Sequence, residues 1–373
     1  MSSIFRSLVS SEERRWPHML PVETLKVIPG LTLGQTLYTP DGRVLLVEGV
    51  KLTETTIRRI QSLNLPFIYV EDPVIGSLPL PRAVPEKMRV DSVFFLHQQF
   101  EQVQKKKGTL DIRQLDTLAS SIVNEVQGYH SPVHHMDVRL PETYLAAHTF
   151  NVAVLAIRTA IALGIKPMRL KDFALGALLH DIGYLFIPDL ELRHRDPLSP
   201  GQRHLVETHP ENGFEWIRKN GFLNITVAHC AFQHHERWDG NGYPRRLKGD
   251  EIHEFAQILS VVDVYDALTN ERPYRSRMQP CQALKQIHAL SGICFNPRVV
   301  TALSDNIAVY PIGSRIQFPD GKVGVVVDTE ASYPFRPKIR LLPPLQEQEC
   351  LPTMLAVDLD SKDILLTDMQ YVS

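Results

Sequence analysis

Residues 174–186, ALGALLHDIGYLF, decide how the central part of this chain folds. The segment is apolar at nearly every position, yet it carries His180 and Asp181 in its middle. Because an aspartate buried without a partner is costly, this pair indicates a site that supplies a cation. The stretch Phe173–Leu190 is also the most membrane-like part of the sequence. Ionisable residues at its centre argue against a membrane span, and no run of eighteen apolar residues occurs.

Helical patches joined by polar loops surround this segment from residue 141 to about residue 305. Strands do not alternate with these helices, and the sequence contains neither a GxGxxG nor a Walker loop. The centre of the chain is therefore expected to be all-α. Apolar periodicity predicts helices near 142–163, 167–182, 200–219, 223–235, 252–269, 280–291 and 296–304.

Small β-rich units are expected at the two ends of the chain. Residues 20–72 contain a hairpin pattern around a PDG turn, a helix with Thr53 as its N-cap, and the closing strand PFIYVED. Residues 306–373 contain two strand runs around a second PDG turn. The fold class is thus mainly α, flanked by a small N-terminal α+β domain and a small C-terminal β domain.

A proline-containing stretch and two helices connect the first unit to the centre. SLPLPRAVP, residues 77–85, fits neither the helical nor the strand spacing of apolar residues and is interpreted as a linker. Residues 86–128 have helical spacing interrupted at Gly108, and their apolar stripe could pack on the central unit or on a second copy of the chain, with internal packing favoured. The expected parts are 1–76, 77–130, 131–305 and 306–373.

Composition excludes several classes of protein. The 373 residues carry 40 Lys and Arg against 42 Asp and Glu, whereas a dedicated DNA-binding chain would be strongly basic. Four cysteines without CxxC spacing argue against a disulfide scaffold and for a reducing compartment. The first residues, MSSIFRSLVSSEERRWP, do not resemble a signal peptide, so a cytoplasmic location is expected. No DNA partner and no membrane insertion are expected.

Seven residues of the central unit form a candidate metal-ligand set. Imidazole and carboxylate ligands suit first-row divalent metals, and the absence of cysteine ligands argues against a closed structural zinc site. Adjacent residues on a helix point about 100° apart, so the two adjacent pairs in the set would reach two neighbouring ions rather than grip one. Two metals roughly 3.5–4 Å apart are a known arrangement for phosphoester hydrolysis. The seven are His148, His180, Asp181, His209, His234, His235 and Asp263.

Other residues with similar chemistry receive a structural interpretation. A single histidine on an apolar helix is more often a core residue than a ligand. Two adjacent histidines are, by themselves, weak evidence for a metal site. His134 and His135 are expected at the surface, as are His194, His204 and His253. Cys230 lies four residues before His234 but is expected to be a buried core thiol. Lys105, Lys106 and Lys107 are interpreted as a solvated helix end.

Several motifs together resemble the HD-GYP family of HD-superfamily phosphohydrolases. They are HDIG at 180–183, HP at 209–210, HHERWDGNGYP at 234–244, DVYDALTNERPYR at 263–275 and CFNPRVV at 294–300. Their order and spacing agree over roughly 141–305. Weaker similarities extend to both ends, in PVETL…PGLTLG…LLVEGVKL and in YPIGSRIQFPDGKVGVVV.

The resemblance implies an HD-type helical bundle that degrades cyclic di-GMP to pGpG, and in some members to GMP, in bacterial signalling. It implies two or three metals, commonly iron or manganese, held by the seven residues above with Asp181 as the bridge. Arg272 and Arg275 match positions that hold substrate phosphates, which a guanidinium fork suits. The family's substrate and partner contacts lie in a segment called the GYP loop, which is matched here by Asp239, Gly240, Gly242, Tyr243 and Pro244.

Two residues depart from the family pattern. Tyr184 replaces the lysine of HDIGK, and the loss of one electrostatic donor costs about 10²–10³ in rate in comparable cases. Arg245 or Lys248 could supply the missing charge. Tyr144 stands where three-metal members carry glutamate, which favours two metals.

Three functions therefore stay open. The first is a cyclic di-GMP phosphodiesterase with Asp181 and Tyr184 at the reacting centre. The second is a receptor or interaction module with weak turnover, which could contact a protein partner through the GYP loop or the N-terminal unit, or form a homodimer. The third is a phosphohydrolase for another nucleotide.

Overall fold

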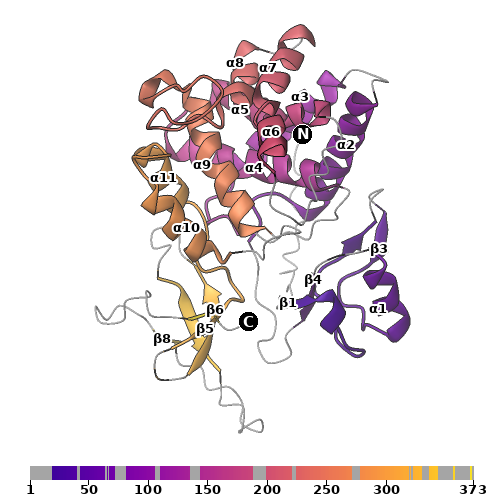
Figure 1. Cartoon of the computed structure of the whole chain (residues 1–373). Helices are drawn as coiled ribbons and strands as arrows, with labels where there is room; N and C mark the ends of the chain where they lie inside the picture. The colour runs from indigo at the N-terminus through magenta and orange to yellow at the C-terminus, as the bar shows by residue number, and fades with distance from the viewer. Residues whose placement is uncertain are drawn as a thin grey trace, which may run out of the picture.

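A computed structural model provides the fold of the chain (Figure 1). It is mainly helical, with small sheets towards both ends. The residues that the structure describes are 19–39, 43–63, 65, 67–71, 81–105, 110–134, 143–187, 199–220, 224–270, 278–318, 320, 322–329, 336–342, 356–357 and 370–371.

The helices pack into one body around a shared apolar core. Leu96, Ile122, Phe150 and Phe173 are buried in this core, and they come from four different helices. The connector helices thus pack on the central unit, as the sequence favoured. The α-helices are α2 (Glu86–Gln104), α3 (Ile112–Gln127), α4 (Tyr144–Ala162), α5 (Pro167–Leu179), α6 (Pro200–Val206), α7 (His209–Asn220), α8 (Ile225–Gln233), α9 (Glu254–Thr269), α10 (Pro280–Ala289) and α11 (Pro297–Ser304), and a 3₁₀ turn, η3 (Ile182–Phe186), follows α5.

The predicted helix 200–219 is wrong as one element, because the chain forms α6 and α7 in its place. Pro210 gives the reason. A proline has no N–H to bond the carbonyl four residues earlier, so a continuous helix would leave the Val206 carbonyl without its partner. The Nδ1 atom of His209 lies 2.7 Å from that carbonyl oxygen and takes the place of the missing donor. The helix break therefore fixes the orientation of a candidate ligand.

The helix α4 is the one element among the described residues whose length and apolar composition would suffice to cross a membrane. The stretch singled out from the sequence, Phe173–Leu190, is a different one. Within the fold, 78% of the most apolar part of α4 is buried. Its apolar residues belong to the core that α5 and α9 share.

The described residues between 19 and 71 have an apolar cluster of their own, which includes Leu33, Leu52 and Ile68. Strand β1 (Met19–Glu23) pairs antiparallel with β4 (Phe67–Glu71), and β2 (Leu37–Tyr38) pairs with β3 (Val44–Leu46). The two paired strands of the predicted hairpin and the closing strand are confirmed, whereas β1 was not expected. The PDG turn, residues 40–42, lies outside the described residues. A 3₁₀ turn, η1, covers Thr24–Lys26.

The helix α1 (Glu54–Gln61) begins as the sequence predicts. The Thr53 side chain accepts a hydrogen bond from the Thr56 N–H, and the Thr56 side chain accepts one from the Thr53 N–H. This reciprocal capping box satisfies two N–H groups that the first turn leaves unpaired.

A five-stranded antiparallel sheet follows α11 in the order β8-β7-β6-β5-β9. Ile316, Val326 and Ile339 from this sheet belong to the core of the helical body. Both small units lie on the same side of that body in Figure 1, with the sheet below α10 and α11. The strands are β5 (Arg315–Gln317), β6 (Val323–Asp328), β7 (Lys338–Leu341), β8 (Ala356–Val357) and β9 (Gln370–Tyr371). The domain boundaries proposed from the sequence stay predictions.

Candidate metal centre

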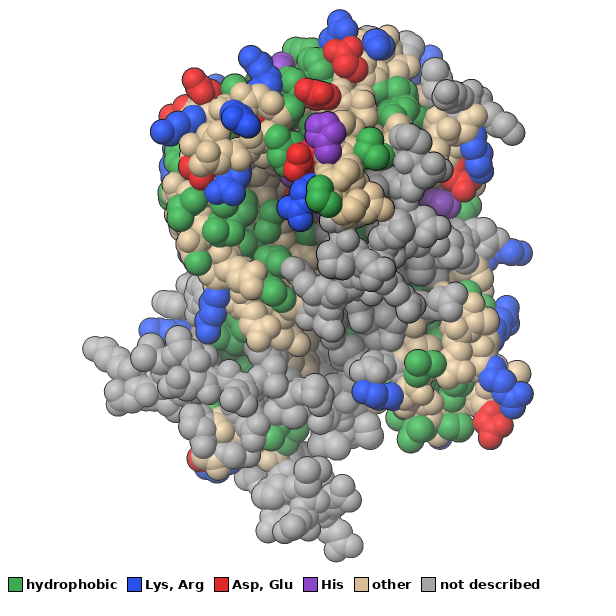
Figure 2. Space-filling view, in the orientation of Figure 1, with side chains coloured by type: hydrophobic (Ala, Val, Ile, Leu, Met, Phe, Trp, Pro, Cys, Tyr) green, Lys and Arg blue, Asp and Glu red, His purple; other side chains and the backbone are tan. Residues whose placement is uncertain are grey.

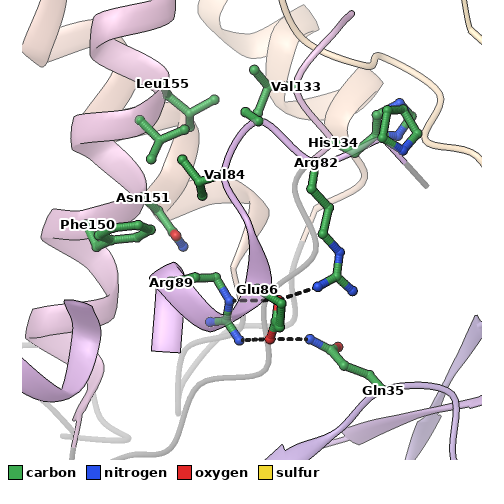
Figure 3. Close-up of a pocket in the computed structure, with 13 residues that line it drawn as sticks. Gln35, Arg82, Val84, Glu86, Arg89, Val133, His134, Phe150, Asn151 and Leu155 are labelled. Carbon is green, nitrogen blue, oxygen red and sulfur yellow. Dashed lines mark hydrogen bonds and ion pairs between the residues drawn. The ribbon is translucent and has the colours of Figure 1, made fainter. Parts of the chain in front are cut away.

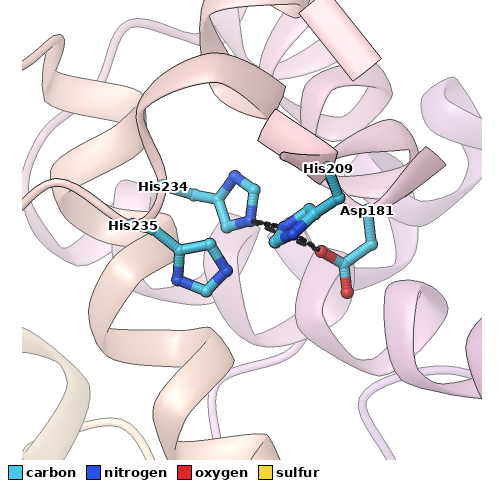
Figure 4. Close-up of side chains that lie close together, drawn as sticks. All are labelled: Asp181, His209, His234 and His235. Atoms are coloured by element: carbon cyan, nitrogen blue, oxygen red, sulfur yellow. Dashed lines mark hydrogen bonds and ion pairs between the residues drawn. The ribbon is translucent and has the colours of Figure 1, made fainter. Parts of the chain in front are cut away.

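Two groups of histidine and aspartate side chains meet inside the helical body. The donor atoms within each group all lie within 4.8 Å of one another. Together the groups contain all seven residues singled out as candidate ligands, which come from α4, α7, α9 and the ends of α5 and α8. The first group is Asp181, His209, His234 and His235 (Figure 4), and the second is His148, His180 and Asp263.

Asp181 lies between the two groups. Its Oδ1 atom is 3.4 Å from the Nε2 atoms of both His209 and His234. Its Oδ2 atom is 3.4 Å from Nε2 of His148 and 3.5 Å from Nε2 of His180. One carboxylate oxygen thus faces each group, which is the arrangement that a bridging ligand between two cations needs.

Backbone carbonyls fix the protonation of three imidazoles. Nδ1 of His180 lies 2.8 Å from the Ala177 oxygen, and Nδ1 of His234 lies 2.9 Å from the Ala231 oxygen. His209 makes the corresponding contact with Val206. A carbonyl oxygen can only accept, so Nδ1 carries the proton and donates. In a neutral ring this leaves Nε2 with a free lone pair, which is how proteins prepare histidine for a metal.

The fourth imidazole is held by a carboxylate that sequence reasoning missed. Asp266 is fully buried, and its Oδ2 atom lies 2.7 Å from Nδ1 of His148. Nε2 of the same ring lies 3.1 Å from Oδ1 of Asp263. Asp266 follows Asp263 by three residues on α9 and therefore shares its face. That spacing was visible in the sequence as a second aspartate in DVYDAL.

The Nε2 atoms of His209 and His234 lie only 3.1 Å apart. Since both rings donate through Nδ1, two lone pairs face each other across this gap. Nε2 of His180 is buried and has no hydrogen-bond partner among the described residues. Acceptors concentrated in this way repel one another unless a cation lies between them, so the donor set suits divalent metal.

Burial would lower the pKa of His148, but hydrogen bonds to Asp181, Asp263 and Asp266 raise it well above its ordinary value. For His180, His235 and Asp181 the shifts favour the forms that bind metal. Burial lowers the pKa of His180 to about 4. Burial, together with His234 and His209, lowers the pKa of His235 well below its ordinary value. Burial would raise the pKa of Asp181, but the neighbouring His180 holds it well below its usual range. Neutral imidazole and charged carboxylate are the forms that bind metal.

The adjacent pairs behave differently from one another. His180 and Asp181 fall in different groups, as expected for neighbours that reach two ions. His234 and His235 fall in the same group, which contradicts that expectation. Each pair begins at the C-cap of a helix, His180 for α5 and His234 for α8, so the angle of 100° within a continuous helix applies to neither pair. The rings of His234 and His235 approach to 4.2 Å between centroids.

Tyrosine rings pack on three of the candidate ligands. The Tyr184 ring stacks on His209 with 4.0 Å between centroids and an interplanar angle of 11°. Tyr243 stacks on His235, and Tyr144 lies parallel to His148 with 6.2 Å between centroids. Tyr184, the residue in the family's lysine position, therefore covers the ring of a candidate ligand.

The GYP loop reaches the centre through Tyr243, while Asp239 is occupied within the loop. Asp239 accepts hydrogen bonds from the Arg237 side chain, which lowers its pKa to about 2, and from the Asn241 N–H. Gly240 adopts a φ of +84°. A side chain at Gly242 would come within 2.4 Å of the Arg237 backbone nitrogen. The loop thus requires glycine at both positions for its shape.

A buried glutamate holds this loop, and sequence reasoning missed it. Glu236 accepts hydrogen bonds from the backbone N–H groups of Arg245, at 2.7 Å, and Leu247, at 3.0 Å. Burial raises its pKa. In the sequence, the position of Glu236 directly after His234 and His235 could have indicated its importance. The side chains of Arg245 and Lys248 are exposed.

The remaining sequence predictions have mixed outcomes. Cys230 is a buried free thiol, as expected, and its sulfur packs on Gly176. His204 is exposed.

His253 is the N-cap of α9, where its Nδ1 accepts a hydrogen bond from the Phe255 N–H. His134 is half-buried rather than fully exposed: its Nδ1 atom is buried, its ring contacts Thr329, and burial lowers its pKa to about 4. Lys106, Lys107, His135, His194, Arg272 and Arg275 lie outside the described residues.

Among the described residues on the face that Figure 2 shows, acidic and basic side chains are interspersed over the helical body. This distribution agrees with the near-neutral composition.

Comparison with known proteins adds a family to this geometry. Residues 134–299 match a model of the HD domain. A cyclic di-GMP phosphodiesterase of Pseudomonas aeruginosa is 29% identical over 227 residues, which are 61% of this chain and 54% of that protein. A 3′3′-cGAMP-specific phosphodiesterase of Vibrio cholerae is 32% identical over 186 residues, which are 50% of this chain and 35% of that protein. The chain thus spans about half the length of the first of these relatives, and less of the second.

Among solved structures, an HDG"Y"P protein from Bdellovibrio bacteriovorus aligns with a TM-score of 0.49 at 18% identity. The alignment covers 77% of this chain and 98% of that one.

Proposed function

Because residues 134–299 of this chain are an HD domain and carry the HD-GYP motifs, we propose that the protein is a metal-dependent phosphodiesterase that hydrolyses cyclic di-GMP to pGpG. The name of the Pseudomonas relative supports this substrate. Further cleavage to GMP belongs to the same proposal.

One observation carries the proposal: the Nε2 atoms of His209 and His234 face each other at 3.1 Å while both rings donate through Nδ1. Two buried acceptors that face each other repel, so this arrangement does not stabilise the core by itself. It is explained by a cation that accepts both lone pairs. The orphaned Nε2 of His180 supports a second cation in the other group.

Two divalent ions, with iron and manganese as the proposed metals, would be held by the two groups. When bound, such a pair activates water and offsets the negative charge of a phosphodiester. The described residues of this chain have three tasks around it. Asp181 places one oxygen towards each group, Asp266 orients His148, and the Nδ1 contacts of the other histidines keep their lone pairs directed inward.

Substrate contacts are proposed for residues at the rim of the centre. Tyr243 stands next to His235, and Tyr184 next to His209, so both rings lie close to the place where a phosphodiester would bind. Arg272 and Arg275 are proposed to hold the phosphates because guanidinium forks match them. Asp239, Gly240 and Gly242 are proposed to shape the loop rather than to touch the substrate.

The test begins with the full chain prepared anaerobically. Elemental analysis should find about two equivalents of metal, and incubation with cyclic di-GMP should release pGpG, measured by chromatography. His209→Ala and His234→Ala should each lower metal content and abolish turnover. His204→Ala is the matched control, because His204 is an exposed histidine on α6. A metal-loaded preparation that releases neither pGpG nor GMP would disprove the proposal.

Tyr184 favours a second candidate, a cyclic di-GMP receptor with weak turnover. A tyrosine brings no positive charge to the scissile phosphate, and its ring is held against His209. Equilibrium binding of cyclic di-GMP without measurable product would support the receptor. The Vibrio relative motivates one further comparison: a higher kcat/KM for 3′3′-cGAMP than for cyclic di-GMP would reassign the substrate within the same chemistry.

A further inference from the structure

A cavity lies where the N-terminal unit, the start of α2 and the middle of α4 meet (Figure 3). Its volume is about 80 Å³. Since one water needs roughly 10–15 Å³, the cavity has room for about five to eight non-hydrogen atoms. Val84, Phe150 and Leu155 give it an apolar wall, whereas Gln35 and His134 are among its polar lining residues.

The charged side chains around this cavity have partners within the protein. The carboxylate of Glu86 pairs with the guanidinium groups of Arg82 and Arg89. It also accepts a hydrogen bond from Nε2 of Gln35 at 3.3 Å. Burial would raise the pKa of Glu86, but Arg89 and Arg82 hold it below its usual value, so the group is a carboxylate. Both arginines make further interactions beyond these ion pairs. Hydrogen bonding rather than net charge therefore decides what the cavity can hold.

A buried hydrogen-bond acceptor that lines the cavity lacks a partner. Gln35 is 4% exposed, and Figure 3 shows its amide nitrogen directed towards Glu86. Because a carboxylate can only accept hydrogen bonds, the nitrogen must face it, which fixes the position of Oε1. Oε1 has no hydrogen-bond partner among the described residues. An unpaired buried oxygen is costly, so this position favours an occupant with an O–H or N–H group.

A second unpaired atom belongs to His134, in the loop after α3. Burial lowers its pKa to about 4, so the ring is neutral and has one donor and one acceptor nitrogen. Nε2 lies 3.3 Å from the Thr329 hydroxyl, which can donate or accept. Nδ1 is buried and has no hydrogen-bond partner in the part of the chain that the structure describes. It is a donor in one tautomer and an acceptor in the other. A hydroxyl group satisfies it in both, whereas an N–H group or a carbonyl satisfies it in only one.

We propose that this cavity binds a short neutral polyol of three or four carbon atoms. One hydroxyl would donate to Oε1 of Gln35, and another would pair with Nδ1 of His134. Water can make the same hydrogen bonds, but only a carbon chain also covers the apolar wall that Phe150 and Leu155 provide. Glycerol, with six non-hydrogen atoms, and erythritol, with eight, have the size that the cavity admits.

The site is separate from the proposed phosphodiesterase centre, although one helix connects them. Phe150 follows the candidate ligand His148 by two residues on α4. The binding proposal does not rest on phosphodiesterase activity, so each proposal can fail alone.

Isothermal titration of the full chain with glycerol and with erythritol tests the proposal. We expect saturable binding of at least one of them with a Kd of about 1 mM or lower, which is attainable for ligands of this size. Gln35→Leu should weaken binding at least tenfold because it removes Oε1, and Val154→Phe should abolish binding by filling the cavity. Gln61→Leu is the matched control, because Gln61 is a half-buried glutamine of the N-terminal unit that does not line the cavity.

Two further compounds separate recognition of the hydroxyl groups from other effects. 1-Butanol has a single hydroxyl and should bind at least tenfold more weakly than the better polyol. Mannitol has the chemistry of the short polyols, but its twelve non-hydrogen atoms exceed the room in the cavity, so it should not bind. Binding of either compound as tight as that of the better polyol would overturn the proposal.

The absence of binding by both glycerol and erythritol would also overturn the proposal and leave water as the occupant. The same holds for polyol binding that Gln35→Leu and Val154→Phe both leave intact. Unfolding curves of each variant show whether it is folded, and Gln35→Leu keeps the test decisive if the cavity-filling variant is not.

Discussion

The ring of Tyr184 lies flat on the ring of His209, with 4.0 Å between centroids and 11° between planes. The stacked tyrosine occupies the position where HD-GYP sequences usually have lysine. His209 is thus restrained twice, by this ring and by the Val206 carbonyl. The substitution exchanges a mobile positive charge for a rigid aromatic contact.

From this contact we predict the effect of Tyr184→Lys. A lysine ammonium would add the missing electrostatic donor, and we expect kcat for cyclic di-GMP to rise by up to about 10²-fold with little change in dissociation constant. Steady-state kinetics and equilibrium binding measure the two quantities. Tyr184→Phe is the control, because it keeps the stacked ring and should keep metal content. An unchanged kcat in the lysine variant would mean that the charge is already supplied elsewhere.

We predict that Asp266→Asn weakens metal binding about 10–100-fold, the usual effect of removing an outer-shell carboxylate. Asp266 contacts His148 at 2.7 Å and is fully buried, so the substitution removes the charge that supports this ring. Metal content after dialysis against graded chelator concentrations measures the change. Asp116→Asn, which removes a half-exposed carboxylate paired with Lys171, should have no effect. Equal metal retention in both variants would contradict the role of Asp266.

We predict that Glu236→Gln destabilises the GYP loop. The carboxylate accepts from two backbone N–H groups, and an amide can accept from both only by leaving its own N–H₂ unsatisfied. The expected loss is about 1–3 kcal/mol in the free energy of unfolding, together with a raised KM. Glu251→Gln is the control, because Glu251 accepts from the Lys248 N–H in the same loop but is exposed. Similar unfolding midpoints for the two variants would argue against a structural role for Glu236.

The sequence was sufficient to predict the helical body and seven histidine and aspartate residues that the fold brings together, because both depend on patterns along the chain. Apolar periodicity located α4, α5 and α9, and the spacing of motifs selected the histidines. It was not sufficient for Asp266 or Glu236, whose importance comes from what they contact in three dimensions. His134 is less exposed than expected for the same reason, because its contact with Thr329 joins residues far apart in the sequence.

We predict that Gly183→Ala severely disrupts the centre. A Cβ atom at Gly183 would lie 1.8 Å from the His209 backbone oxygen and 2.8 Å from the Gly213 nitrogen, so the 3₁₀ turn and α7 would have to separate. We expect a loss of more than about 3 kcal/mol in unfolding free energy, with loss of bound metal. Gly201→Ala is the matched control. Gly201 lies in α6 with open space around it, and alanine should stabilise that helix by about 0.5–1 kcal/mol. A Gly183→Ala protein as stable as the parent would show that η3 and α7 are not in contact.

We predict that His134 makes the protein less stable as the pH falls below 6.5. Burial lowers the pKa of the folded side chain from 6.5 to about 4, partly opposed by Asp328. Between these values the unfolded chain binds a proton that the folded chain does not, so unfolding is favoured as the pH falls through this window. At pH 5 the cost is about 2 kcal/mol for this one group. Urea unfolding at pH 7.5 and pH 5 should therefore show a larger loss of stability for the parent than for His134→Gln, which cannot titrate. Equal losses would mean that His134 is solvated in the folded protein and that its ring can be protonated without cost.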